Sequence, residues 1–182
     1  MELQTVSHYD KMECDRIRRL YHEAFPIEER APFALLMKRV RQERAVMYSL
    51  HHHGQWCGMI YLIMGKDMVY IFYLAIDSSQ RGRGLGKLAM KALLDRYPQH
   101  RVFLALEDWH DTAADNREQR LKRHEFYRQC GLSDLPYHIK EGNVIYSIMG
   151  TNGKIEPPEY KMLMNRYAGF FMRLIVDFRM IP

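Results

Sequence analysis

Residues 81–87 read Arg-Gly-Arg-Gly-Leu-Gly-Lys, and this short stretch decides the fold. Its three alternating glycines remove three Cβ atoms, which lets backbone N–H groups approach a ligand closely. A helical pattern begins here, so the partial positive charge of a helix N-terminus falls at the same place. Two arginines and a lysine add formal charge. The stretch therefore predicts an anion site, and a pyrophosphate fits it best.

Three other nucleotide-binding motifs fit the stretch poorly. A Walker A loop requires Ser or Thr after Gly-Lys, but Lys87 is followed by Leu88. A dinucleotide-binding fingerprint requires a glycine where Lys87 stands, and the strand before the stretch reads as antiparallel. A protein-kinase loop is accompanied by His-Arg-Asp and Asp-Phe-Gly motifs, which this sequence lacks.

Upstream of the glycine-rich stretch, the sequence predicts two helices and then three strands. Apolar spacing predicts helices over 9–25 and 33–43, separated by a turn that contains two prolines. Aromatic and branched residues predict strands over 46–51, 57–64 and 68–76. The turn residues between these strands favour an antiparallel meander.

Downstream, a helix that ends before Pro98 leads to a buried strand over 101–106, and this order implies parallel neighbouring strands. A helix over 117–129 follows. Strands over 137–140 and 144–149 then flank Gly142-Asn143, a dipeptide that favours a hairpin. The sum is an α/β (α+β) domain with a mixed, mostly antiparallel sheet.

From about Pro157, apolar residues keep helical spacing to the end of the chain, although Gly169 weakens the pattern. We therefore expect residues 1–150 to form the main domain and 151–182 to form a helical extension. This extension is expected to pack on the same domain or to form the interface of a homodimer.

Composition limits the class of protein. The chain has 182 residues, of which 47% are hydrophobic and 27% charged, as expected for one globular domain. The net charge of +5 is spread over mixed clusters, with neither a basic tail nor a zinc-finger spacing. Nucleic-acid binding therefore rests on net charge alone, and we expect no nucleic-acid partner.

Other features of composition concern location and metals. Apolar runs are too short to span a bilayer and the start lacks a secretory pattern, so we expect a cytoplasmic protein without a membrane partner. Three cysteines without a paired spacing fit a reducing compartment. The run His51-His52-His53 is interpreted as a polar strand end, because adjacent strand residues face opposite sides. We expect no metal.

Arg81-x-x-Gly84-x-Gly86 resembles the Arg/Gln-x-x-Gly-x-Gly/Ala pattern of the GNAT superfamily of acetyl-CoA-dependent N-acetyltransferases. Residues 73–76 resemble the bulged fourth strand of that family. Tyr127 to Leu132 resembles its Tyr-x-x-x-Gly-Phe helix end. The order of predicted elements matches as well, over roughly residues 3–150. The resemblance implies a central sheet with splayed fourth and fifth strands.

The resemblance also implies a binding mode for acetyl-CoA. The backbone groups of Leu74 and Ile76 would pair with the pantetheine arm as an added strand would. The glycine-rich stretch would hold the pyrophosphate. The residues expected to bind the cofactor are Leu74, Ala75, Ile76, Arg81, Gly82, Arg83, Gly84, Leu85, Gly86 and Lys87.

Two catalytic residues follow from the resemblance. Tyr127 stands where the family has a tyrosine that protonates the departing thiolate. Glu107, at the end of a buried strand, is the candidate base that deprotonates the amine, with its neighbour Asp108 and with Glu28 or Glu29 as rivals. Both the catalytic and the structural interpretation of these residues stay open.

Some positions depart from the family pattern. Glu28 and Tyr70 are expected to contact the substrate, and Tyr70 replaces a glutamate of some histone-acetylating relatives. Asn116 lies eleven residues before Tyr127, where many relatives have seven. The basic residues Arg117, Arg120, Lys122 and Arg123 read more readily as a solvated helix face than as a phosphate site.

The predicted function is acetyl transfer from acetyl-CoA to a small-molecule or peptide amine by direct attack in a ternary complex. The alternative is a non-catalytic module that uses the same fold to bind coenzyme A. The acceptor is not specified by the sequence, because acceptor loops vary on a common fold.

Overall fold

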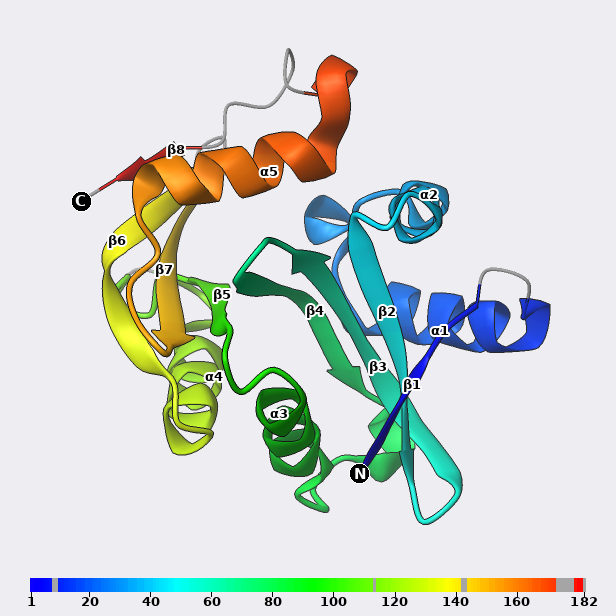
Figure 1. Ribbon diagram of the computed structural model, residues 1–182. Coiled ribbons are helices and arrows are strands. Elements are labelled where there is room, and N and C mark those ends of the chain that lie inside the picture. The colour runs from blue at the N-terminus through cyan, green and yellow to red at the C-terminus, as the bar shows by residue number, and fades with distance from the viewer. Residues whose placement is uncertain (8–9, 113, 142–143, 173–178, 182) are drawn as a thin grey trace. The chain divides into compact units, whose positions relative to one another are not determined.

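The computed structural model describes residues 1–7, 10–112, 114–141, 144–172 and 179–181. The chain divides into two compact units. The first comprises residues 1–64 and 71–98, and the second comprises residues 65–70 and 99–182. Figure 1 shows the helices and strands of both.

The first unit contains β1 (Glu2–Thr5), β2 (Ala45–His52), β3 (Gln55–Met64) and most of β4 (Met68–Ile76), in that sheet order. β1 pairs antiparallel with β2, and β2 with β3. The strands of the meander lie where the sequence predicted them. β1 was not predicted, because four residues with a largely exposed pattern carry no apolar alternation.

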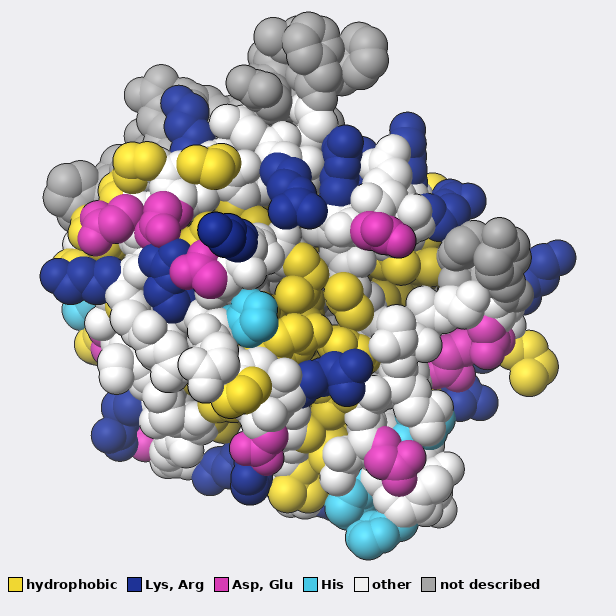
Figure 2. Space-filling model, in the orientation of Figure 1, with side chains coloured by type: hydrophobic (Ala, Val, Ile, Leu, Met, Phe, Trp, Pro, Cys, Tyr) yellow, Lys and Arg dark blue, Asp and Glu magenta, His cyan; other side chains and the backbone are white. Residues whose placement is uncertain are grey.

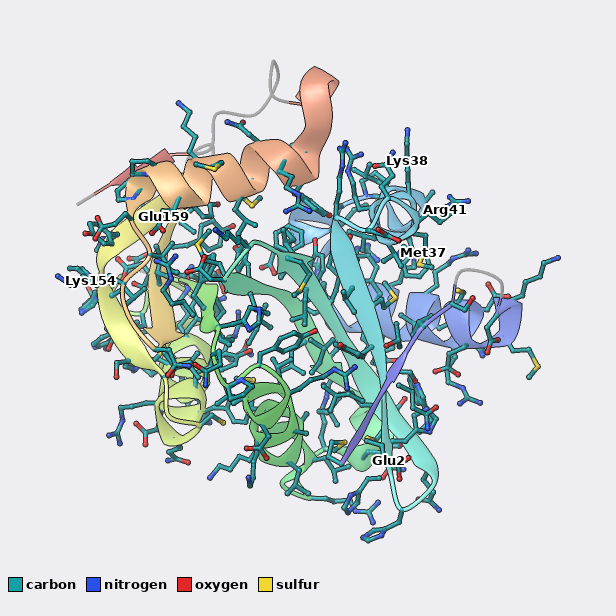
Figure 3. The ribbon with its side chains drawn as sticks, in the orientation of Figure 1. Glu2, Met37, Lys38, Arg41, Lys154 and Glu159 are labelled. Carbon is teal, nitrogen blue, oxygen red and sulfur yellow. The ribbon has the colours of Figure 1, made fainter. Side chains whose placement is uncertain are left out.

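Helices of the first unit are α1 (Lys11–Ala24), α2 (Phe33–Arg41) and α3 (Leu85–Arg96), with single turns η1 (Ile27–Glu29) and η2 (Ser78–Gln80). Asp10 begins α1 by accepting the N–H of Glu13 at 3.0 Å. α1 buries Ile17, Leu20 and Tyr21. On α2, by contrast, Lys38 and Arg41 project outward (Figure 3).

The second unit is built on the start of β4, β5 (Arg101–Glu107), β7 (Val144–Thr151), β6 (Ser133–Glu141) and β8 (Arg179–Ile181), in that order. β4 and β5 are parallel and pair through Met68–Arg101, Val69–Val102 and Tyr70–Phe103. Among the described residues, β5 has no such pairing with the rest of β4. This parallel pair and the antiparallel β5–β7–β6 ladder confirm the mixed sheet that the sequence predicted.

α4 (Arg117–Gln129) and α5 (Pro157–Met172) are the helices of the second unit. α5 buries Tyr160, Leu163 and Met164. Arg101 ties it down by donating two hydrogen bonds of 2.7 and 2.8 Å to the carboxylate of Glu159, which Figure 3 labels on α5. The same guanidinium also binds Asp67.

The predicted helix over the whole C-terminal end is wrong for its last residues. Gly169 has φ 73° and ψ 177°, which breaks the helical geometry. Arg179–Ile181 form β8, which pairs antiparallel with β6. Residues 173–178, with the predicted helical positions 174, 175 and 178, and the Gly142-Asn143 turn lie outside the described residues. No described helix is both long and apolar enough to cross a membrane.

Gly58 on β3 allows β4 to approach closely, and this gives a test of the fold. A Cβ atom at position 58 would press on the carbonyl of Ala75 and lie 3.2 Å from the Cα of Ile76. We expect Gly58→Ala to lower the free energy of unfolding by about 1–3 kcal/mol in urea denaturation. Gly54→Asn is the control, since its position is open and Asn tolerates its φ of 74°. Equal, small losses in both variants would contradict the close approach.

Candidate functional site

The loop between β4 and α3 is shaped by one capping residue and two glycines. Asp77 accepts the backbone N–H of Ser79 at 3.0 Å and so begins the η2 turn. Gly82 and Gly84 have φ of 75° and 73°, a left-handed conformation that side chains with a Cβ rarely adopt. Gly84 is the N-cap of α3, and its carbonyl accepts the N–H groups of Lys87 and Leu88.

The cations of this loop have no carboxylate partner in the described part of the chain. Arg81 donates from Nε to the carbonyl of Ile76 at 3.0 Å, which fixes the loop to the end of β4. Arg83 donates to the side-chain oxygen of Gln80 at 2.5 Å. Arg81, Arg83 and Lys87 are all exposed. No described carboxylate therefore neutralises their positive charge.

The start of α3 offers N–H groups to an anion. The first amides of a helix have no partner within it, and the helix dipole makes them partially positive. No acidic residue stands in the first turn of α3, where one would compete with a bound anion. Backbone amides and cations without a described carboxylate partner thus lie together on one exposed loop of the first unit, and the anion site there stays a prediction.

The end of β4 carries the three residues expected along the cofactor arm. Ala75 is buried, whereas Leu74 and Ile76 are partly exposed. The carbonyl of Ile76 already accepts the Arg81 side chain, so a ligand would share it through the second lone pair. The Asp77 N–H donates to Cys57 of β3 at 2.9 Å.

The turn between α1 and α2 is held by a tyrosine hydroxyl. Tyr73 of β4 donates to the carbonyl of Glu29 at 2.8 Å and accepts the N–H of Ala31 at 3.2 Å. Its ring packs edge-on against Tyr21 and Phe25. The backbone at Glu29 is therefore held in place, while its side chain is exposed. The side chain of Glu28 lies outside what the structure describes.

Tyr127 lies in the last turns of α4, in the second unit. Its side chain is partly buried, and its ring contacts that of Phe126 edge-on. Burial raises the pKa of the Tyr127 phenol to about 12, although nearby Arg123 acts to lower that pKa. The phenol hydroxyl has no hydrogen-bond partner among the described residues. A proton is therefore held on this oxygen through the neutral pH range.

Glu107, at the end of β5, is engaged in ion pairs. One carboxylate oxygen accepts Arg120 at 2.9 Å, and the other lies 3.4 Å from Arg123. Asn116 donates to both oxygens at 3.3 and 3.2 Å. The interpretation of Arg120 as solvated is wrong, because its side chain is only 15% exposed and paired. Sequence spacing alone does not show that this helix turns one arginine inward.

The sequence did not predict the hydrogen-bond network of Asp108. Burial acts to raise the pKa of its carboxyl, but hydrogen bonds from the backbone and ring of His110 and from Ser147 outweigh it, and the pKa is lowered. The ring Nδ1 of His110 lies 3.0 Å and the hydroxyl of Ser147 3.1 Å from one Asp108 oxygen. Ser147 comes from β7, so only the β5–β7 pairing brings this residue close.

Tyr70, predicted to contact substrate, lies in the interior of the second unit. It is 4% exposed, and its ring stacks on Phe103 with centroids 4.7 Å apart and planes 5° apart. Tyr160 of α5 contacts the same pair of rings. This packing accounts for an aromatic residue at position 70 without any ligand.

Two cysteine thiols are buried in the first unit. Burial is the main cause that raises the pKa of the Cys57 and Cys14 thiols, which disfavours the nucleophilic thiolate. In the described ranges, no three His, Cys, Asp or Glu side chains are grouped so that they could hold a metal ion.

Comparison with known proteins places the chain in a family. Residues 14–132, more than half of the chain, match the model of the acetyltransferase (GNAT) family. The chain belongs to this family. No curated protein matches the sequence. The family match confirms the predicted resemblance to the GNAT superfamily, and the glycine-rich stretch at 81–87 lies within the matched segment.

Solved structures share the GNAT fold at low identity. A putative GNAT-family acetyltransferase from Bacteroides thetaiotaomicron is 18% identical with a TM-score of 0.74, covering 94% of this chain and 98% of its own. An aminoglycoside 6'-N-acetyltransferase complexed with coenzyme A is 14% identical with a TM-score of 0.64, covering 86% and 100%. The ribosomal-protein-S18-alanine N-acetyltransferase from Escherichia coli is 16% identical with a TM-score of 0.60, covering 85% and 95%.

The Glu107 pairing gives a test within the second unit. We expect Glu107→Gln to lower the free energy of unfolding by about 1–3 kcal/mol, because it removes the nearer of the two carboxylates that pair with partly buried Arg120. Glu118→Gln is the matched control, since it removes an exposed pair with Lys122 on the same helix. Glu118→Gln should lower the free energy of unfolding by less than about 0.5 kcal/mol in urea denaturation. Equal losses would show that the Glu107 pairs do not stabilise the fold.

Proposed function

We propose that this GNAT-family protein transfers an acetyl group from acetyl-CoA to a primary amine by direct attack. The observation that carries the proposal is the exposed loop of the first unit, where helix amides and three unneutralised cations gather. A pyrophosphate is a dianionic group of the size that such a loop binds. The amide-bearing pantetheine arm is suited to the backbone at Leu74 and Ile76.

The reaction needs four movements of atoms and protons. The neutral amine nitrogen attacks the thioester carbonyl carbon, and a C–N bond forms. A backbone N–H near Leu74 would stabilise the oxyanion that develops. The C–S bond then breaks, and the departing thiolate takes a proton. The attacking nitrogen loses a proton to a base or to water.

Tyr127 is proposed as the proton donor to the thiolate. A phenol with a pKa of about 12 stays protonated at the pH where amines react. Its hydroxyl is not engaged by another described residue, so it is available to a ligand. Glu107 remains the proposed base, and it would accept a proton through water or after releasing one of its bonds to Arg120 and Asn116.

The acceptor is proposed to be a primary amine. Three similar structures are named as N-acetyltransferases of an aminoglycoside, of a ribosomal-protein alanine and of spermidine. The chemistry that these names share is an amine nucleophile. The first-unit turn that carries Glu28 and Glu29 is the proposed acceptor-binding segment, held in place by Tyr73.

Cofactor binding is tested at Gly86, which lies at the start of α3 without a left-handed φ. We expect Gly86→Trp to abolish acetyl-CoA binding in calorimetry, because an indole would fill the space above the helix amides. The melting temperature should stay within a few degrees of the parent. Lys91→Trp, on the exposed face of the same helix, is the control and should bind normally. Normal affinity in folded Gly86→Trp would refute the cofactor assignment.

Catalysis is tested at Tyr127. We expect Tyr127→Phe to lower kcat about 100-fold or more in a thiol-release assay, with acetyl-CoA affinity little changed. Because the pKa of Tyr127 is raised, its phenol should keep its proton below about pH 10, and ionisation of Tyr127 should therefore cause no loss of activity in that range. Unchanged turnover in the variant would remove Tyr127 from the mechanism. Acetyl-CoA binding by a parent protein that shows no turnover across an amine panel would favour the non-catalytic module.

A further inference from the structure

A second feature of the first unit is a cavity of about 190 Å³ between the β2–β3 turn and the β4–α3 loop. Its apolar wall is made by Cys57 and Leu85, both buried. Its polar wall is made by His52, His53 and Arg83, with the amides of Gln55 and Gln80. Figure 2 shows histidine side chains, in cyan, gathered near the end of the β2–β3 hairpin. The side chains that line the cavity include three that can carry positive charge and no carboxylate.

The β2–β3 turn has a histidine, His53, at a position where the backbone is left-handed. His53 has φ 50° and Gly54 has φ 74°, so both central residues of the two-residue hairpin are left-handed. Asn, Asp or Gly is favoured at the first of these positions, because a larger side chain is strained there. The hairpin turn therefore holds the His53 backbone in a conformation that few side chains adopt.

The groups around the cavity repel one another when they are charged. The rings of His52 and His53 lie 4.0 Å apart. Burial lowers the pKa of His52, and His53, the amino terminus of Met1 and Arg83 lower it further. The cluster is therefore electrostatically unfavourable on its own.

Acidic groups near the turn are few and engaged elsewhere. Glu2, labelled in Figure 3 near the end of the hairpin, lies opposite His51 in the β1–β2 register and accepts a hydrogen bond from Gln4. The carboxylate of Asp77 accepts the N–H of Ser79, and its negative charge helps to raise the pKa of the Cys57 thiol. A bound anion would supply the negative charge that these carboxylates do not.

We propose that the cavity between the β2–β3 turn and the β4–α3 loop binds a phosphate group, held by His52, His53 and Arg83. A guanidinium and imidazolium N–H groups donate charge-assisted hydrogen bonds to phosphate oxygens. Gln80, which already accepts from Arg83, fixes the direction of the guanidinium. The phosphate belongs either to coenzyme A outside its pyrophosphate or to a separate small molecule. Only the first source rests on the proposed function.

The test is a titration of the full protein with inorganic phosphate at pH 6, followed through the histidine ring signals in NMR spectra. We expect saturable shifts at His52 and His53 and a raised pKa of His52, since an anion stabilises imidazolium. Affinity should fall as the pH rises and the histidines lose their protons. Absence of saturable shifts in the parent protein would overturn the proposal.

Two variants distinguish phosphate binding in the cavity from nonspecific attraction to a positively charged protein. His53→Asn keeps a residue that tolerates the left-handed turn, and Arg83→Gln removes the guanidinium charge. Each should weaken phosphate binding about tenfold or more. Lys91→Gln, which removes one positive charge from α3 away from the cavity, should bind phosphate as the parent does. If all three variants bound phosphate with the same affinity as the parent protein, the proposal would also be overturned.

The source of the phosphate is distinguished by displacement. Release of bound phosphate by coenzyme A but not by 3′-dephospho-coenzyme A identifies the cofactor's own phosphate as the occupant. Retention with both compounds identifies a separate phosphate-bearing ligand, and either result supports the site. If coenzyme A fails to bind while phosphate still shifts His52, the proposed function fails and the phosphate site stands.

Discussion

The left-handed turn at Gly84 is the constraint on which the candidate cofactor site depends. A residue with a Cβ is strained at φ 73°, so the chain can begin α3 at this angle at little cost only with glycine. The turn places unpartnered helix amides at an exposed loop instead of against a capping side chain. No atom lies within 4 Å of where a Cβ of Gly84 would stand, so the space beside the turn is open. A binding site for an anion requires such a combination of open space and unsatisfied donors.

Arginines of the candidate cofactor site have different partners from arginines elsewhere in the fold. Arg101 and Arg120 are each bound by carboxylates, and each fixes a helix or loop of the second unit. Arg81 and Arg83 instead bind a carbonyl and an amide oxygen, which orient the guanidinium without neutralising it. The net charge of +5 is therefore informative only when each cation is assigned a partner. Cations held in position but not neutralised are suited to a ligand that brings the charge.

Much of the fold could be predicted from the sequence, because helix and strand periodicity is local. The meander strands, α4 and the glycine-rich turn follow from residue spacing and turn chemistry. β1 and β8 could not be predicted in this way, since each is a short strand that exists only through pairing with a distant segment. The burial of Arg120 and the Asp108–Ser147 bond were missed for the same reason. Tyr70 shows a related limit, because an aromatic residue can face a core as readily as a substrate.

The two candidate catalytic groups differ in a way that suits opposite roles. Tyr127 packs against the ring of Phe126 and has no described hydrogen-bond partner for its hydroxyl, and burial favours its neutral, protonated form. Glu107 accepts hydrogen bonds from Arg120 and Asn116, so its carboxylate oxygens are already engaged. A protonated phenol can give a proton to a thiolate, whereas a carboxylate whose oxygens are both engaged must first release a hydrogen bond or act through water. The environment therefore supports the donor more directly than the base. A free primary amine that arrives already neutral, or that loses its proton through water, would need only the donor.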